Sequence, residues 1–231
     1  MKQKHINLKI NKMKKHVLLI LLFVVILFTA CQKDEPIQNV KYKVTFSFNW
    51  NSQNFPTDYP SNAHFSKLIG WSHDSTSNFF QVGTIASGGI KKMAEAGATS
   101  PLDFEITNRI STGEGFNLVV GDGLGSGTGN ISVLVNVDKQ HPSITLATMI
   151  APSPDWYAAV VNINLLKDGE FINEKTVPGL VYDSGTDNGI TFTSANSVTN
   201  PKQPISLFVS PPLGNDTTII PDFATVKFVK Q

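Results

Sequence analysis

The chain has 231 residues, in which 19 lysines and arginines nearly balance 18 aspartates and glutamates. Six of the basic residues and none of the acids lie among residues 1–30, so the rest of the chain carries 13 basic and 18 acidic side chains, a net charge of −5. This mildly acidic remainder argues against nucleic acid as a partner, and it is compatible with a bound divalent cation.

Residues 1–30 are predicted to be a secretory signal. Lysines precede an apolar stretch, Val17–Ala30, which at fourteen residues is too short for a membrane span of ~20 residues and fits the apolar region of a signal peptide. The stretch ends in "LFTAC", which resembles a bacterial lipobox, and the chain's single cysteine, Cys31, is then the lipidated residue. The alternative is a stray cysteine after an ordinary signal peptide.

Residues 31–39 form the predicted lipidated tether. Its sequence "CQKDEP" resembles the surface-export signal of lipoproteins from the Bacteroidetes, in which acidic residues follow the lipidated cysteine. We therefore expect an outer-membrane lipoprotein that is displayed at the cell surface and held in the membrane through Cys31. A protein that faces the periplasm, with these charges serving only as a solvated tether, is the alternative.

Residues 40–231 are predicted to form one domain, because about 200 residues suit a single domain. Their abundant Gly, Pro, Ser, Thr and Asn favour a sandwich or barrel of short strands. "VKYKVTFSFNW" opens the domain with strict alternation, which puts Phe46 and Trp50 on the apolar face and Lys43 on the polar face. One short helix is predicted around residues 90–94, and Gly97 stands where a glycine would end it. "LDFEI" and "FNLVV" are interpreted as short strands.

The second half of the domain is predicted to consist of strands and turns. The Gly-rich stretch "GDGLGSGTGN" lacks the Gly-Lys-Ser/Thr of a phosphate-binding loop and is interpreted as a hairpin loop. Further strands are expected in residues 131–137, 143–150, 157–166, 190–193, 205–209 and 224–229. In the third of these runs, Tyr157 and Leu165 should lie on the same face. Eight to ten such strands predict an all-β, antiparallel sandwich with one short helix.

Three aspartates stand out in this predicted sandwich. Asp155 lies in "APSPDWYAAV" just before a strand, and Asp183 and Asp187 lie four residues apart in "VYDSGTDNGITF", which we also place before a strand. If the two strand starts share one end of the sandwich, three carboxylates face one volume, and a hard divalent cation is their natural partner. The alternative is ordinary turn chemistry, in which an aspartate accepts hydrogen bonds from nearby backbone N–H groups.

Three longer stretches resemble the spondin domain family, the N-terminal domain of F-spondin and mindin-like proteins. These are "FPTDYPSNAHFSKLIGWSHDSTSNFFQVGTIASGGIKKMAEAG", "HPSITLATMIAPSPDWYAAVVNINLLKDGEF" and "YDSGTDNGITFTSAN", which follow in order from about Phe55 to about Pro204. The most specific motifs are "PSPDW" and "D-x-G-T-D-x-G". The resemblance implies a β-sandwich related to C2 domains, with a calcium ion held at one end.

The resemblance also implies the calcium ligands. They correspond here to Asp155, Asp183 and Asp187, and a further acid of the family pattern falls on Asn136, which can offer an oxygen but no charge. Asp138 lies two residues further on and could substitute only if the strand end bends.

Three functions are compatible with these features. The first is a calcium-binding, membrane-anchored module for extracellular adhesion or recognition, with an unidentified protein or glycan as its ligand. The second is a cell-envelope hydrolase, carbohydrate-active or other, that uses paired aspartates. The third is a structural envelope lipoprotein. We expect no enzyme, because the sequence shows no nucleophile motif and no catalytic histidine in a recognisable setting.

Overall fold

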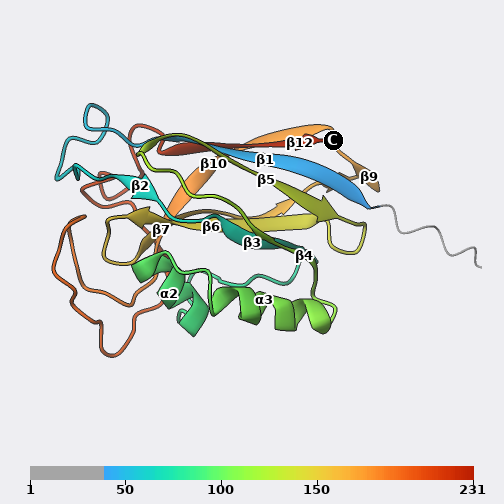
Figure 1. Ribbon diagram of the computed structural model, residues 1–231, viewed down its shortest axis with the longest axis horizontal. Coiled ribbons are helices and arrows are strands. Elements are labelled where there is room, and N and C mark those ends of the chain that lie inside the picture. Colours follow the sequence, from blue (N-terminus) through green and yellow to red (C-terminus); the bar gives the residue numbers. More distant parts are fainter. Residues whose placement is uncertain (1–38) are drawn as a thin grey trace, which may run out of the picture. The chain divides into compact units, whose positions relative to one another are not determined.

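The computed structural model describes residues 39–231, so the predicted signal and lipidation site lie outside the described residues (Figure 1). Strand β1, Val40–Asn49, opens the domain in the predicted register. Phe46 and Trp50 are fully buried and Lys43 is exposed, because the side chains of an extended strand alternate between core and solvent.

The domain is the predicted antiparallel β-sandwich. Its strands run in the order β4-β3-β6-β7-β10-β12-β1-β5, and Figure 1 shows β10, β12, β1 and β5 in one layer above β3, β6 and β7. The further strands are β2 (His64–Phe65), β3 (Ile69–His73), β4 (Gly115–Val120), β5 (Thr128–Val137), β6 (Ser143–Ala151), β7 (Trp156–Asn164), β8 (Leu166–Lys167), β9 (Glu170–Phe171), β10 (Glu174–Asp183), β11 (Ser206–Leu207) and β12 (Ala224–Lys230).

Strand β10 connects the two layers. Its first part, up to Gly179, pairs with β12, and its last part, from Leu180, pairs with β7. This strand was not predicted, because Pro178 interrupts the apolar pattern and proline cannot donate a ladder hydrogen bond. The predicted strand at residues 190–193 is wrong: the segment is a turn in which Phe192 is buried and Ile190 is exposed.

Two helices cover the outer side of the lower layer (Figure 1). Helix α2, Gly88–Ala96, is the predicted helix, and Gly97 ends it in the left-handed conformation with φ of 63°. Helix α3, Leu102–Ser111, replaces the predicted strand "LDFEI". Leu102 and Ile106, one turn apart, are the buried residues of α3, so the pattern there has helical rather than strand periodicity.

The domain has two hydrophobic cores. One lies between the layers and contains Phe46 and Trp156, and the other lies between the lower layer and the helices and contains Tyr157. Both cores draw their residues from 40–228. A fragment that starts at Lys33 therefore contains everything that the fold needs.

A bulge in β7 makes one prediction wrong, namely that Tyr157 and Leu165 lie on the same face. Thr145 on β6 faces two residues of β7, because Ile144 pairs with Ile163 while Leu146 pairs with Val160. The extra residue, Asn162, has φ of 52°. As a result Leu165 lies in the core between the layers and not beside Tyr157 as predicted.

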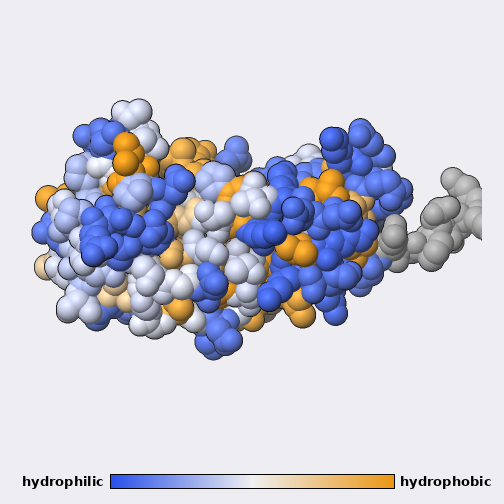
Figure 2. Space-filling view, turned by 90° about the horizontal axis from the view of Figure 1, so that it is seen from above, coloured by the Kyte–Doolittle hydropathy of each residue, from blue (hydrophilic) through white to orange (hydrophobic). Residues whose placement is uncertain are grey.

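The outer face of the upper layer carries both polar and apolar side chains, among them Leu134 of β5, which is 55% exposed. Figure 2 looks onto this face and shows hydrophilic residues gathered at the end where β1 begins. Lys41 and Lys43 of β1 are exposed there, and Lys227 of β12 pairs with Glu174 of β10 at 3.0 Å. Within residues 39–231, no helix is both long and apolar enough to cross a membrane.

Candidate functional site

The pairing of β7 with β10 brings the first two predicted aspartates together. Asp155 immediately precedes β7, and Asp183 is the last residue of β10, opposite Trp156. The prediction that Asp183 precedes a strand is therefore wrong, yet the antiparallel pairing still places the end of β10 beside the start of β7. The backbone N–H of Ser184 donates to the Asp155 carbonyl at 3.2 Å and fixes this arrangement.

Asp155 is completely buried, and its two carboxylate oxygens have different environments. Oδ2 accepts hydrogen bonds from the backbone N–H groups of Thr186 (2.7 Å) and Asp187 (3.1 Å) and from the hydroxyl of Ser184 (2.9 Å). Oδ1 is buried without a hydrogen-bond partner among residues 39–231. Burial raises the pKa of Asp155, and the hydrogen bonds to Oδ2 partly offset this effect.

Asp183 is partly buried beside Asp155. Its Oδ1 accepts a hydrogen bond from the backbone N–H of Gly185 at 2.7 Å, in a tight turn in which Gly185 has φ of 70°. Burial, followed by the negative charge of Asp155, raises the pKa of Asp183 to about 6, and the charge of Asp187 adds to the shift. Two neighbouring carboxylates thus resist simultaneous ionisation.

The third aspartate is engaged differently. Asp187 Oδ1 accepts from the N–H of Gly189 at 2.7 Å, and Oδ2 accepts from the N–H of Ser197 at 3.0 Å. These bonds close the loop of residues 184–199, as turn chemistry predicts. Within the described part of the chain, no three Asp, Glu, His or Cys side chains are grouped so that they could hold a metal ion.

The structure does not bring Asn136 to this site. Asn136 lies near the end of β5, before β6, whereas Asp155 lies beyond the other end of β6. A nine-residue strand is roughly 27–30 Å long, so Asn136 and Asp138 are at the opposite end of the sandwich from Asp155. Asp138 is already engaged there, because its Oδ1 accepts from Nδ1 of His141 at 2.9 Å.

Two residues of the site were missed from the sequence. Ser184 occupies the variable position and Thr186 the threonine position of the "DSGTD" turn; their hydroxyls lie 2.7 Å apart, and both donate to Asp155 Oδ2. The signal was present, because a hydroxyl beside an acid in a Gly-containing turn is a typical donor. What the arrangement offers chemically is one buried, unpartnered carboxylate oxygen next to a second carboxylate, an environment suited to a cation.

Comparison with the sequences of known proteins shows the family of this chain. The sequence profile of the Spondin_N family matches residues 40–216, which include the whole acidic site. The chain belongs to the Spondin_N family. Among its relatives, human spondin-2 is 33% identical over 178 residues, which are 74% of this chain and 53% of spondin-2.

Two further spondins show the same range of similarity. Rat spondin-2 is 29% identical over 209 residues, covering 82% of this chain and 61% of the relative, and rat spondin-1 is 32% identical over 173 residues, covering 71% and 21%. This spondin-type chain therefore spans between about a fifth and three fifths of the relatives that it matches. The resemblance found in the three sequence stretches is confirmed.

Proposed function

We propose that this protein is a calcium-binding, membrane-anchored module for extracellular recognition, of the spondin type. The observation that carries the calcium part is the buried Oδ1 of Asp155, which lacks a partner among residues 39–231. An ionised oxygen in such a place is costly unless a positive charge accompanies it. Asp155 and Asp183 would hold the ion. Asp187 could become a third ligand only if one of its carboxylate oxygens gave up the hydrogen bond that it accepts from a backbone N–H.

Calcium would supply the charge that these carboxylates lack. It takes several oxygen ligands in flexible geometry, so carboxylates and carbonyls from a loop suit it. Binding would neutralise the repulsion from Asp155, which after burial is the second cause of the raised pKa of Asp183, and would hold the loop of residues 184–199 in one conformation. A fixed loop at one end of a rigid sandwich is a suitable recognition surface for a protein or glycan.

Membership of the spondin family and the sequence of the first 39 residues support the location. "LFTAC" and "CQKDEP" favour an outer-membrane lipoprotein displayed on the cell surface. The burial of Asp155 argues against the hypothesis that the protein is a hydrolase, because a sugar in solution cannot reach a carboxylate that is 0% exposed. Recognition rather than catalysis is therefore the activity that we propose.

Calorimetry of the fragment 33–231 tests the calcium part. Calcium at 100 times its dissociation constant should add about 2.7 kcal/mol to the free energy of unfolding, compared with the fragment in chelator. Asp183→Ala should abolish most of this gain. The matched control is Asp168→Asn, at an exposed turn before Gly169, which should leave the gain unchanged.

Asp187→Ala separates a metal ligand from a turn residue. The Asp187 carboxylate accepts two backbone N–H groups, so its loss should destabilise the fragment by about 1–3 kcal/mol both in calcium and in chelator. If Asp183→Ala behaves in this same way, or if wild-type fragment shows no calcium-dependent stabilisation, the calcium site does not exist.

A further inference from the structure

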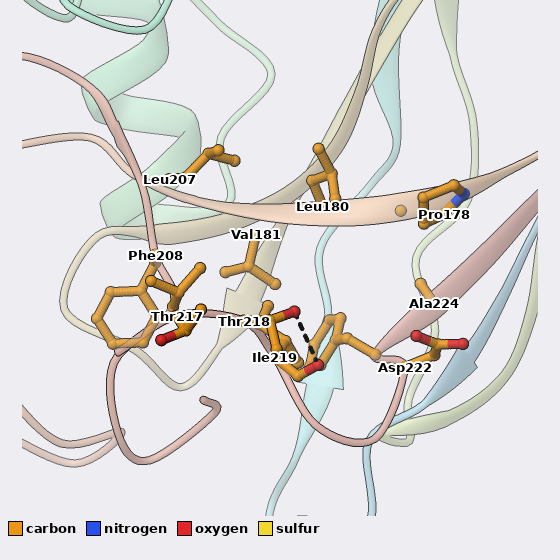
Figure 3. Close-up of a pocket in the computed structure, with 13 residues that line it drawn as sticks. Pro178, Leu180, Val181, Leu207, Phe208, Thr217, Thr218, Ile219, Asp222 and Ala224 are labelled. Atoms are coloured by element: carbon orange, nitrogen blue, oxygen red, sulfur yellow. Dashed lines mark hydrogen bonds between the residues drawn. The ribbon is translucent and has the colours of Figure 1, made fainter. Parts of the chain in front are cut away.

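A cleft of about 320 Å³ opens beside β10 (Figure 3). It is lined by residues from β10, from the segment that follows β11 and from the segment that leads into β12. None of the three aspartates described above lines it. Its volume is at the lower end of the range for pockets that hold small organic molecules.

The cleft exists because β10 changes partners. Gly179 is the last residue of β10 that pairs with β12, through Ala224, and a side chain at Gly179 would come within 2.9 Å of the Ala224 Cβ. On the same edge β10 next pairs with β11, where Tyr182 faces Leu207. Strands β12 and β11 therefore diverge from one point of β10 and leave a slot between them.

The slot has a buried apolar floor and an exposed rim. Val181, Phe223 and Ala224 form the floor and are almost completely buried. On the rim, Leu180 is 41% exposed and Leu207 is 47% exposed. Together with the buried floor, these leucines give most of the recess an apolar lining.

One charged group lines this slot. Asp222 is exposed beside Ala224 in Figure 3, and its carboxylate forms no hydrogen bond or ion pair with any residue of 39–231. Phe208 lies toward the other end of the slot in the same view. The segment 203–226 contains no lysine or arginine that could neutralise Asp222.

We propose that this slot is a binding site for a small organic cation with an apolar body, such as an arylalkyl amine. The apolar body would lie on Val181 and Phe223 between the two rim leucines. The ammonium group would lie at the Asp222 end, where a carboxylate without an internal partner accepts a charge-assisted hydrogen bond. The site is independent of the calcium site, since neither set of residues contains a member of the other.

Calorimetric titration of the fragment 33–231 with three matched probes tests the proposal. The probes are 4-phenylbutylamine, 4-phenylbutanol and 4-phenylbutyrate, which share an apolar body and differ in charge, and the buffer contains chelator at pH 7. The amine should bind up to about fivefold more tightly than the alcohol, since its charge pairs with an exposed carboxylate, and the carboxylate probe should bind most weakly.

Variants locate the site. Asp222→Asn, at an exposed position that the fold tolerates, should bring the affinity for the amine down to that for the alcohol. Leu207→Ser should weaken the binding of amine and alcohol alike, and Asp216→Asn, on the same segment but outside the lining, should change neither. Absence of amine binding, equal affinity for amine and alcohol, or an unchanged amine affinity in Asp222→Asn would each overturn the proposal.

Discussion

Asp183 holds a proton more readily in the folded chain than in the unfolded one, because burial and the charge of Asp155 raise its pKa from 3.8 to about 6. Between about pH 4 and pH 6 the folded state therefore binds the extra proton, and the contribution of Asp183 to stability falls as the pH rises. The shift corresponds to at most about 3 kcal/mol, and the partial exposure of the side chain reduces this figure.

We predict that Asp183→Asn stabilises the calcium-free fragment in a pH-dependent way. The variant and the wild type should have similar free energies of unfolding below about pH 4, and the variant should be more stable at pH 7 by up to about 3 kcal/mol. The comparison must be with the wild type at each pH, because burial lowers the pKa of His73 to about 4 and this residue opposes Asp183 over the same range. Urea unfolding in chelator provides the measurement, and a difference that does not grow with pH would contradict the assignment.

At the scale of elements, β1 contributes its whole apolar face to the core between the layers. Phe46 is fully buried and packs against Phe48 with ring centroids 5.7 Å apart. We predict that Phe46→Ala lowers the free energy of unfolding by about 3–5 kcal/mol, because it removes a large buried side chain and leaves a cavity. Lys43→Ala on the opposite face is the control and should change stability by less than about 0.5 kcal/mol. Equal effects in the two variants would mean that the buried and exposed faces of β1 are wrongly assigned.

The elements differ in how well the sequence predicts them. β1 and α2 follow from local pattern alone, since strict alternation marks the strand and Gly97 marks the end of the helix. Helix α3 resembles a strand in the sequence, because the five residues of "LDFEI" are too few to distinguish helical from strand periodicity. Strand β10 is not predicted from the sequence, because it changes its partner after Gly179 and because pairing between distant segments produces no local sequence pattern.

The same contrast applies to the site. Asp155 and Asp183 lie side by side because β7 and β10 pair at that end, and the backbone N–H of Asp187 also reaches Asp155, whereas the Asp187 carboxylate is engaged within its own loop. The fourth position, Asn136, is implied only by the family resemblance, and the length of β6 separates it from the others. Which oxygen of an aspartate remains unpartnered depends on loop geometry and cannot be found from residue types.

At the scale of the whole molecule, the predicted anchor lies before the described residues. We predict that Cys31→Ser moves the protein from the membrane fraction to the soluble fraction, because the substitution removes the only cysteine that can carry a lipid. Fractionation followed by immunodetection provides the measurement. A Cys31→Ser protein that stays with the membranes would refute the lipobox interpretation.

Replacing Lys33, Asp34 and Glu35 by alanine should separately reduce protease access on intact cells, if these residues direct export.

The central position of β1 has a mechanical consequence. β1 lies between β12 and β5, paired with both along most of its length, and it begins at the opposite end of the sandwich from Asp155. Tension between an anchor before Val40 and a ligand at the Asp155 end would pull β1 along its own axis. The ladder hydrogen bonds on both sides are perpendicular to the strand and would share that load at the same time. Tension between the two chain ends would act differently, because Gln231 bonds to Lys41 at 2.9 Å and the strands would peel apart one pair at a time. The domain should therefore resist force best in the direction that adhesion would apply.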